Sequence, residues 1–597
     1  MNEDRISLSK LRIISFGLIV GFLFVFAFLF RWQIVEAKRF EEMASERIRN
    51  VSIPSLRGSI YAKDSTTLAF QERRFDIFVY IPELERAEEY QKQTREEFIS
   101  KVSNSLGQEE TVLQKRLSGN SLWIKIADKL TNDEKENLLN QRSEANSERR
   151  LEGMFVEFTS ERVYPENTLA SQVVGFYADN GTGEKEGRAG IELYWENSLR
   201  PFEGSTLEQV DSFQNTIPIL DFTPVDEKRG IDIYLTIDLQ FQRIIEQKLK
   251  EGVERYEAEG GAIVLMDPKT GEIISMASYP TFDPNDLGAS DNPLSFRNMA
   301  TSVPYEFGSV GKIFTVAGAI DKGAVTPATM VLPEGHDGCE FYQDPNLREC
   351  QQNIAQCRVC TFDSLPQPPK DVAKSLVTSD NVGLYHIAEE LGPEDFHAYL
   401  EAFRLNKPTG IEMYESTGYI RPLDEWNIAD LVVHSYGHGY QSTLLEVVSG
   451  VSAIANDGKI MQPHIVSKIV EPDGSEKKIE PEVIAQPVKP ETATLVAGIL
   501  REAFTSGLYE HYYRDLAKYP VAVKSGTALI AYEDRVGYSD EINTTYVGFD
   551  ISESKSFVMG VWLHKPKRGG LSSQNVRLVW NDTFREIKDY LDIEPDL

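Results

Sequence analysis

Three short motifs occur in one order along this chain and constrain it more than any other feature. They are Ser309–Lys312 (Ser-Val-Gly-Lys), Ser379–Asn381 (Ser-Asp-Asn) and Lys524–Thr527 (Lys-Ser-Gly-Thr). A serine and a lysine three positions apart on a helix lie on one face, about one turn from each other. This spacing sets an amine beside a hydroxyl, which can activate a serine without a histidine. The first motif therefore predicts a reactive serine with a lysine as its base.

Single motifs recur in this chain, so their surroundings have to select the functional copy. Ser-x-x-Lys begins at Ser7, Ser309, Ser475 and Ser552, and Ser-Asp-Asn begins at Ser290 and Ser379. Ser309 opens the apolar run 313–320, which predicts a buried helix with the serine at its N-terminus. Ser379 leads into a second apolar stretch, whereas the other copies lie in polar turns, in a loop or ahead of the N-terminal apolar run.

Taken together, the motifs are the signature of β-lactamases and penicillin-binding proteins, and the chain resembles the class B penicillin-binding proteins. Further segments resemble this family: Arg57–Tyr61 with Leu68-Ala69, Arg162–Pro165, Gly190–Leu193, Gly261–Gly271, Tyr305–Gly308 and Ser435–Gly439. The resemblance covers roughly residues 50–590. It implies a peptidoglycan D,D-transpeptidase that cross-links stem peptides through a serine acyl-enzyme and is acylated by β-lactams.

The resemblance also implies a role for each residue of the first two motifs. Ser309 attacks the penultimate D-Ala carbonyl, and Lys312 takes the serine proton, which requires a pKa lowered by burial or by a neighbouring cation. Ser379 passes a proton toward the leaving amine. Asn381 hydrogen-bonds Lys312 and the substrate amide.

The third motif is expected to bind the substrate. Lys524 supplies positive charge for the terminal carboxylate and lowers the pKa of Lys312, and Ser525, Gly526 and Thr527 line the same subsite. The backbone N–H groups of Ser309 and Thr527 would form the oxyanion hole. The resemblance implies no metal and no organic cofactor.

Two departures from the family pattern lie beside the reactive serine. Phe307 stands where the family usually has proline, and Gly311 stands where it has a bulky residue. Ser525 replaces the usual threonine but keeps the hydroxyl. A glycine inside a helix costs up to about 1 kcal/mol relative to alanine. The departures leave one alternative open, a catalytically weak or inactive scaffold of the cell-wall synthesis complex. A β-lactamase is disfavoured by the long region before the motifs.

The N-terminal region predicts a membrane anchor. Residues 13–30 carry no charge, are apolar except for Ser15, and are just long enough to span a bilayer. Basic residues precede this run at Arg5, Lys10 and Arg12, which favours a cytoplasmic N-terminus. We therefore expect a cytoplasmic tail over 1–12, a single-pass anchor over 13–32 and a catalytic domain outside the cytoplasm, at the plasma membrane. A cleaved signal peptide fits less well, because the apolar run is long for one.

Length and pattern predict two further domains in an α+β chain of 597 residues. We expect a mixed α+β pedestal over 33–228, with residues 33–50 helical in period and charge-rich helices over 86–101 and 131–149. The family resemblance implies that a transpeptidase domain over 229–590 contains a five-stranded antiparallel sheet with helices on both sides, and a tail over 591–597 follows it.

Charge and family resemblance narrow the partners. The net charge of −31 argues against nucleic acid. Class B relatives work beside a multi-pass membrane glycan polymerase and other cell-wall synthesis proteins. Gly17 and Gly21 would form a small-residue face for such a contact, although a passive tether remains an alternative.

All four cysteines of the chain lie between the first and second motifs. They are Cys339, Cys350, Cys357 and Cys360. Outside the cytoplasm, two disulfides with three possible pairings are the leading interpretation. A four-thiolate zinc site and free thiols are the alternatives, since Cys357 and Cys360 have the spacing of metal ligands.

Overall fold

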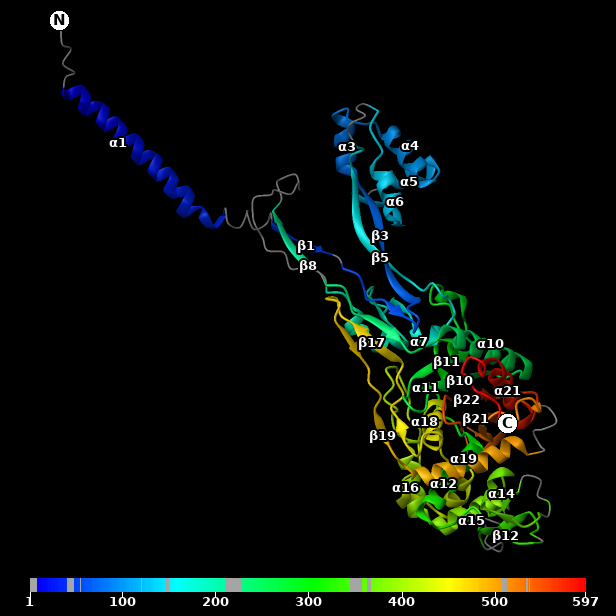
Figure 1. Ribbon diagram of the computed structural model, residues 1–597. Helices are drawn as coiled ribbons and strands as arrows, with labels where there is room; N and C mark the ends of the chain where they lie inside the picture. The colour runs from blue at the N-terminus through cyan, green and yellow to red at the C-terminus, as the bar shows by residue number, and fades with distance from the viewer. Residues whose placement is uncertain are drawn as a thin grey trace. The chain divides into compact units, whose positions relative to one another are not determined.

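The computed structural model describes most of the chain, and many of its elements are labelled in Figure 1. The described residues are 8–39, 48–53, 55–119, 121–144, 150–202, 204–209, 228–334, 336–343, 357–361, 365, 367–506, 513–532, 535 and 537–596. The chain forms two units, the first from residues 1–56 and 201–229 and the second from residues 57–200 and 230–597.

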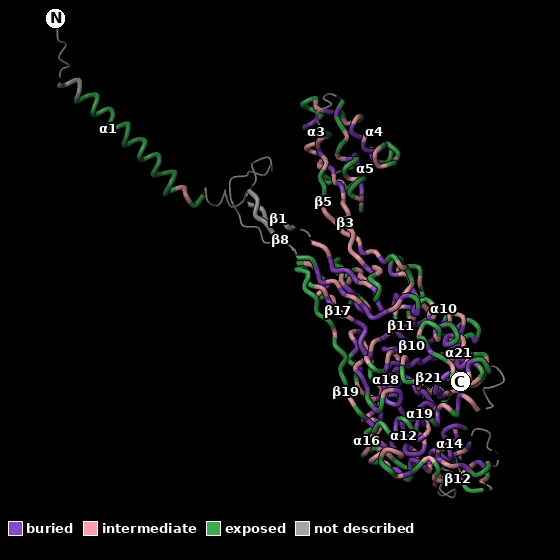
Figure 2. The backbone as a smooth tube through the Cα atoms, viewed as in Figure 1, coloured by how far each residue is buried: buried purple, intermediate pink, exposed green. Residues whose placement is uncertain are grey.

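The first unit holds the predicted anchor. Helix α1 (Leu8–Phe30) continues as a π-helical turn over Arg31–Val35, and its apolar side chains from Ile13 onward are exposed (Figure 2). Among the described residues, one helix is long and apolar enough to cross a membrane, over Arg12–Val35. The unit also contains β1 (Ile48–Ile53), which pairs antiparallel with β8 (Gly204–Gln209). The prediction of helical structure through residue 50 was therefore wrong at residues 48–50. These residues form a strand because β8, far along the sequence, pairs with them.

The second unit contains the predicted five-stranded antiparallel sheet, in the order β11-β10-β22-β21-β20. These strands are β10 (Gly260–Met266), β11 (Ile273–Tyr279), β20 (Val521–Ala531), β21 (Tyr538–Asp550) and β22 (Val558–His564). Every residue of β10 is buried, and its side chains alternate between two apolar cores. A strand buried on both faces reads as a continuous apolar run, as β10 does.

Helices cover both faces of this sheet. Helices α10 (Leu239–Tyr256) and α21 (Val576–Ile587) pack on one face through the core that contains Ile263 and Leu265. Helices α12 (Lys312–Lys322), α18 (Leu444–Ala455) and α19 (Pro490–Thr505) belong to the core on the other face. Helices α14 (Val372–Val377), α15 (Asn381–Leu391), α16 (Pro393–Ala402) and α17 (Ile428–Ser435) pack around α12 on that side. The α+β prediction for this domain is confirmed.

A second sheet joins segments from both sides of residue 229. Its order is β18-β17-β9-β2-β3-β4, and β5 also pairs with β3. The strands are β2 (Ile60–Tyr61), β3 (Thr67–Tyr80), β4 (Trp123–Leu130), β5 (Met154–Val163), β9 (Asp232–Leu235), β17 (Val466–Val470) and β18 (Glu476–Lys478). Strand β9 pairs in parallel with β2 on one side and antiparallel with β17 on the other. The strands before residue 229 are therefore joined through β9 to β17 of the catalytic part.

A small helical lobe lies at the ends of β3, β4 and β5. It comprises α3 (Ile81–Glu89), α4 (Arg95–Leu106), α5 (Glu110–Leu117) and α6 (Asn132–Leu139) and has its own apolar core. The helix predicted over 86–101 is divided between α3 and α4, because the Thr94 side chain caps α4 by accepting from Glu97 N. Helix α6 ends at Leu139, well before residue 149.

Candidate active site

The fold brings the three motifs together from three different elements. Ser309 lies in a 3₁₀ turn, Gly308–Gly311, that leads directly into α12. The second motif forms the junction of α14 and α15, and the third lies in β20 at the edge of the five-stranded sheet. Lys312 Nζ donates to Ser379 Oγ at 3.1 Å, and Lys524 Nζ donates to the same oxygen at 3.0 Å. One hydroxyl therefore connects all three motifs.

Lys312 is fully buried and its amine has three acceptors. These are Ser379 O at 2.7 Å, Ser379 Oγ at 3.1 Å and Asn381 Oδ1 at 2.7 Å. Burial and the nearby Lys524 lower the pKa of Lys312 well below its ordinary value, while Asp380 opposes the shift. The site thus favours the neutral amine of Lys312. When Lys312 takes up a proton, the three acceptors can hydrogen-bond the resulting ammonium. Such a group can serve as a general base.

Lys524 is also buried, and burial lowers its pKa to about 7. Its Nζ donates to the carbonyl oxygen of Ser525 at 2.9 Å as well as to Ser379. An anion arriving at this amine would favour its charged form. Lys524 is therefore poised to change its protonation state when a carboxylate binds.

The turn that carries Ser379 is unusual for a residue with a side chain. Ser379 has a φ of 59°, in the left-handed region that few such residues adopt. Asp380 follows it and caps α15, because its Oδ1 accepts from Gly383 N at 3.0 Å. The other carboxylate oxygen of Asp380 pairs with Lys370 Nζ at 2.6 Å, and both side chains are buried.

Glycines allow the turn that holds Ser309 to pack against two neighbouring backbones. Gly308 has a φ of 61°, and a Cβ there would lie 2.4 Å from the Thr527 carbonyl oxygen. A Cβ on Gly526 would lie 2.1 Å from Phe307 O, and one on Gly437 would lie 1.9 Å from Gly308 O. Backbone contacts this close leave no space for side chains. The turn is thereby fixed between β20 and the glycine turn that contains Gly437.

Both departures beside Ser309 are accommodated by this packing. Phe307 is buried, and its ring meets the rings of Tyr440 and Phe314 edge to face, with centroid distances of 5.3 Å and 6.3 Å. A Cβ on Gly311 would lie 2.5 Å from Tyr440 Oη. Tyr440 thus occupies the space that a larger residue at position 311 would need, so neither departure disrupts the site.

The other described copies of the motifs make their hydrogen bonds elsewhere or lie in exposed turns. Ser290 Oγ donates to Ser295 in a loop, Ser475 lies in an exposed turn and Ser552 Oγ donates to Asp550. Ser7 lies outside the described residues. Ser309 itself is partly exposed, and within the described parts of the chain its hydroxyl makes no hydrogen bond. Thr527 Oγ1 accepts from Ser572 N at 3.0 Å.

A disulfide-bridged hairpin adjoins the second motif. Cys339 of β13 (Cys339–Phe341) is bonded to Cys360 of β14 (Arg358–Cys360). Cys357 is disulfide-bonded as well, and Cys350 lies outside the described residues. The Cys339–Cys360 bond is incompatible with the four-thiolate zinc alternative. Asn381 Nδ2 donates to Cys360 O at 3.1 Å, so the hairpin contacts the catalytic region directly.

Sequence reasoning did not identify Lys370 or the Cys360 carbonyl as parts of this region, and it singled out His438 only as a member of the segment Ser435–Gly439, without a role. Burial and the nearby Lys312 lower the pKa of His438 to about 4, which keeps its ring neutral. Lys370 lies in the short strand β15 (Lys370–Asp371), ten positions before Asp380, and belongs to none of the motifs. No sequence signal distinguishes it from an ordinary surface lysine.

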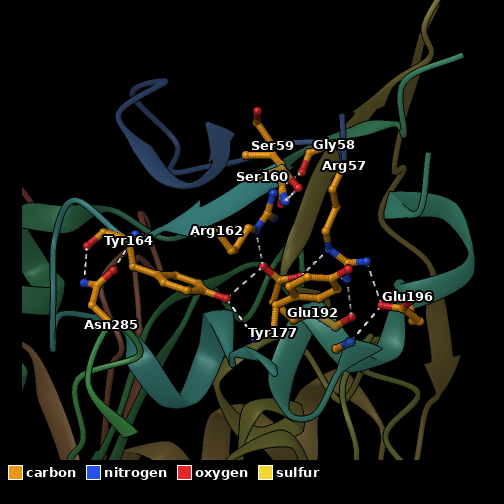
Figure 3. A network of polar contacts seen from close by, with 12 residues as sticks. Arg57, Gly58, Ser59, Ser160, Arg162, Tyr164, Tyr177, Glu192, Glu196 and Asn285 are labelled. Atoms are coloured by element: carbon orange, nitrogen blue, oxygen red, sulfur yellow. Dashed lines mark hydrogen bonds and ion pairs between the residues drawn. The ribbon is translucent and has the colours of Figure 1, made fainter. Parts of the chain in front are cut away.

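Three of the family-like segments, Arg57–Tyr61, Arg162–Pro165 and Gly190–Leu193, lie in the predicted pedestal and meet in one buried polar network (Figure 3). Both carboxylate oxygens of the fully buried Glu192 are paired, one with Arg57 and the other with Arg162, each at 2.7 Å. Arg162 Nη1 donates to Gly58 O at 2.7 Å, and Tyr164 Oη donates to Glu192 at 3.2 Å. A carboxylate held by two guanidinium groups keeps a lowered pKa despite its burial.

This network extends to the transpeptidase part through Asn285. Tyr164 N donates to Asn285 Oδ1 at 3.0 Å, and Asn285 Nδ2 donates to Tyr164 O at 2.9 Å (Figure 3). Arg57 also pairs with Glu196 at 2.7 Å. These three segments are therefore structural: they fasten residues 57–200 to the catalytic part of the same unit.

Comparison with known proteins identifies related sequences and folds. The penicillin binding protein transpeptidase domain model matches residues 261–582, and the penicillin-binding protein dimerisation domain model matches residues 52–235. Stage V sporulation protein D of Bacillus subtilis (strain 168) is 26% identical over 576 residues, which cover 95% of this chain and 83% of that protein.

Two further proteins extend the comparison. The probable peptidoglycan D,D-transpeptidase PenA of Neisseria meningitidis (strain Z2491) is 25% identical over 427 residues, 70% of this chain and 67% of that protein. The crystal structure of penicillin binding protein 2X from Streptococcus thermophilus has the same fold, with a TM-score of 0.73 and 20% identity over 91% of this chain and 81% of that one.

Proposed function

This chain belongs to the class B penicillin-binding proteins and is a serine-type peptidoglycan D,D-transpeptidase, and we propose that Ser309 is its nucleophile. Like its family, it acts on peptidoglycan and is acylated by β-lactams. One observation carries the assignment of the site: Lys312 and Lys524 both donate to the Ser379 hydroxyl, in the motif copies beside Ser309. This convergence supports one catalytic centre built from all three motifs.

In the acylation step, Ser309 Oγ attacks the penultimate D-Ala carbonyl of a stem peptide. The proton of Ser309 passes to neutral Lys312, and the resulting ammonium is held by Asn381 and Ser379. The backbone N–H groups of Ser309 and Thr527 are proposed to stabilise the oxyanion, each typically worth about 2.7–4 kcal/mol of the barrier.

Collapse of the tetrahedral intermediate breaks the bond to the terminal D-Ala. The leaving amine takes a proton by way of the Ser379 hydroxyl, which lies between the two lysines. Lys524, Ser525 and Thr527 bind the carboxylate of the terminal D-Ala. An amine of a second stem peptide then attacks the acyl-enzyme, and this forms the cross-link. A β-lactam follows the first half of this path, since the serine opens its ring and the leaving nitrogen stays attached.

The test of the nucleophile is labelling with fluorescent penicillin followed by peptide mapping. Wild-type protein should carry one label on Ser309, and Ser309→Ala should carry none while it unfolds within a few degrees of the wild type. Labelling of Ser309→Ala would overturn the assignment.

Helix α1 is the membrane anchor, and we propose that its N-terminus faces the cytoplasm. The basic residues Arg5, Lys10 and Arg12 support this orientation. We further propose a multi-pass membrane glycan polymerase as the partner of α1. Gly17 and Gly21 have open space around their α-carbons, so a neighbouring helix could approach closely there.

A further inference from the structure

Lys370 is a third buried lysine close to the catalytic centre. Its side chain is 6% exposed, and its Nζ lies 2.6 Å from Asp380 Oδ2, which is fully buried. The same amine donates to Gln367 Oε1 at 2.9 Å. A buried carboxylate needs such a partner, because an unpaired charge in the interior is costly.

Asp380 connects this ion pair to the second motif. Its carboxylate caps α15 through Gly383 N, and the residue stands between Ser379 and Asn381. Ser379 has a φ of 59°, and a left-handed residue with a side chain persists only where its surroundings hold it. The ion pair and the helix cap therefore hold Asp380 in place, directly after the strained residue Ser379.

Asn381, on the other side of Asp380, is held from the same segment of the chain. Its Nδ2 donates to Cys360 O at 3.1 Å, and its Oδ1 accepts from Lys312 at 2.7 Å. Because the amide nitrogen is engaged by the hairpin, the amide oxygen is directed at Lys312. Lys370 and Cys360 therefore hold the two residues that directly follow Ser379.

We propose that Lys370 is a positioning residue for acyl transfer: its ion pair with Asp380 holds the turn that aims the Ser379 hydroxyl at Lys312 and Lys524. This inference rests on the proposed function of the site. Lys370 lies outside all three motifs, and it acts through Asp380 without touching the substrate.

Lys370 also contributes to the charge balance around Lys312. The groups that face Lys312 are Lys524 from β20, Lys370 from β15, Asp380 ahead of α15 and His438 after α17. Lys524 and Lys370 lower the pKa of Lys312 beyond the effect of burial, and Asp380 raises it. Loss of the Lys370 charge removes one group that lowers the pKa of Lys312, and it leaves the Asp380 carboxylate without its ion-pair partner. Both changes raise the pKa of Lys312 and reduce the fraction of neutral base.

The experiment measures the rate of acylation by fluorescent penicillin in the full-length protein from about pH 6 to about pH 10. Lys370→Gln should react about tenfold or more slowly at neutral pH, and its rate should rise at higher pH than that of the wild type. Lys370→Arg should restore the wild-type profile. Lys374→Gln is the matched control, since Lys374 lies four positions away, half-exposed, 3.8 Å from Glu502.

A second variant guards against a failure of Lys370→Gln to fold. The double variant Lys370→Met with Asp380→Asn removes both charges, and the asparagine can still cap α15. It should melt near the wild type, react more slowly at every pH and lose the shift to higher pH.

The proposal is overturned if Lys370→Gln or the folded double variant has the wild-type rate at every pH. A wild-type protein that penicillin does not label would instead refute the proposed function of the site.

Discussion

Lys312 and Lys524 donate to one oxygen atom, the hydroxyl of Ser379, at 3.1 Å and 3.0 Å. A hydroxyl has two acceptor lone pairs and one donor hydrogen. Because both lone pairs are engaged by the lysines, the hydrogen of Ser379 has to point away from them. It is thus available to the leaving amine of a substrate, and each lysine can return a proton to the oxygen that gave one up.

Ser379→Ala is accordingly expected to slow acylation by about 10²–10⁴-fold, the usual contribution of a positioned proton donor. Ser290→Ala, in the other Ser-Asp-Asn copy, should leave the rate unchanged. The second-order rate constant with a fluorescent penicillin measures both. If the two variants exchanged these outcomes, the wrong copy of the motif would have been assigned.

The stability of the protein should depend on pH through Lys524. Burial lowers the pKa of Lys524 to about 7, whereas the unfolded chain has an ordinary lysine pKa, so the unfolded state binds more protons between these values. Stability attributable to this residue therefore increases as the pH rises through that window. Lys524→Met should lose this increase in thermal melts, and Lys269→Met, at an exposed site, should keep it. A parallel pH dependence in wild type and Lys524→Met would contradict the buried neutral lysine.

Gly311→Ala should destabilise the protein by about 1–3 kcal/mol, because the new Cβ would lie 2.5 Å from Tyr440 Oη and 2.7 Å from Gly437 Cα. The gain in helix propensity, up to about 1 kcal/mol, is too small to offset this overlap. Gly498→Ala in α19 is the matched control: its α-carbon has open space, so that variant should be as stable as the wild type or more so. Chemical denaturation distinguishes the two, and equal effects would show that position 311 has room.

Glu192→Gln should destabilise the second unit by about 3–5 kcal/mol, since it leaves Arg57 and Arg162 without their buried counter-charge. Glu196→Gln should cost less, because Glu196 is partly exposed and, among the described residues, forms an ion pair with Arg57 but not with Arg162. The midpoint of thermal unfolding measures both variants. A larger loss in Glu196→Gln would mean that Glu192 is not the centre of the network.

Replacement of Gly17 and Gly21 by leucine should reduce co-purification of the membrane polymerase and leave penicillin labelling intact, because bulky side chains block close helix packing in lipid. Ile19→Phe with Leu23→Phe adds bulk to the opposite face of α1 and serves as the control. If the leucine variant co-purifies as the wild type does, the helix is a passive tether.

Much of the architecture followed from local pattern. The segment Gly261–Gly271 resembled the family's first catalytic strand and turn and contains most of β10, and the order of the three motifs indicated one catalytic domain. The sequence pattern gave a wrong prediction at β1. Its first residues have a helical period, yet the strand pairs with β8, more than 150 positions later in the chain. A strand partner that distant leaves no trace in the periodicity of either segment.

The sequence by itself selected the residues that we propose carry the chemistry, since a candidate serine nucleophile, a lysine base and a carboxylate-binding lysine are recognisable by type and spacing. Only the tertiary structure decided how they are tuned. The low pKa of Lys312 arises from burial beside Lys524, more than 200 positions away, and the turn of Ser379 is held by Lys370 through Asp380. Gly311 departs from the family pattern, and it fits because Tyr440 fills the space that a larger residue at this position would need. Charge, burial and packing depend on which distant segments meet, and that is a property of the fold as a whole.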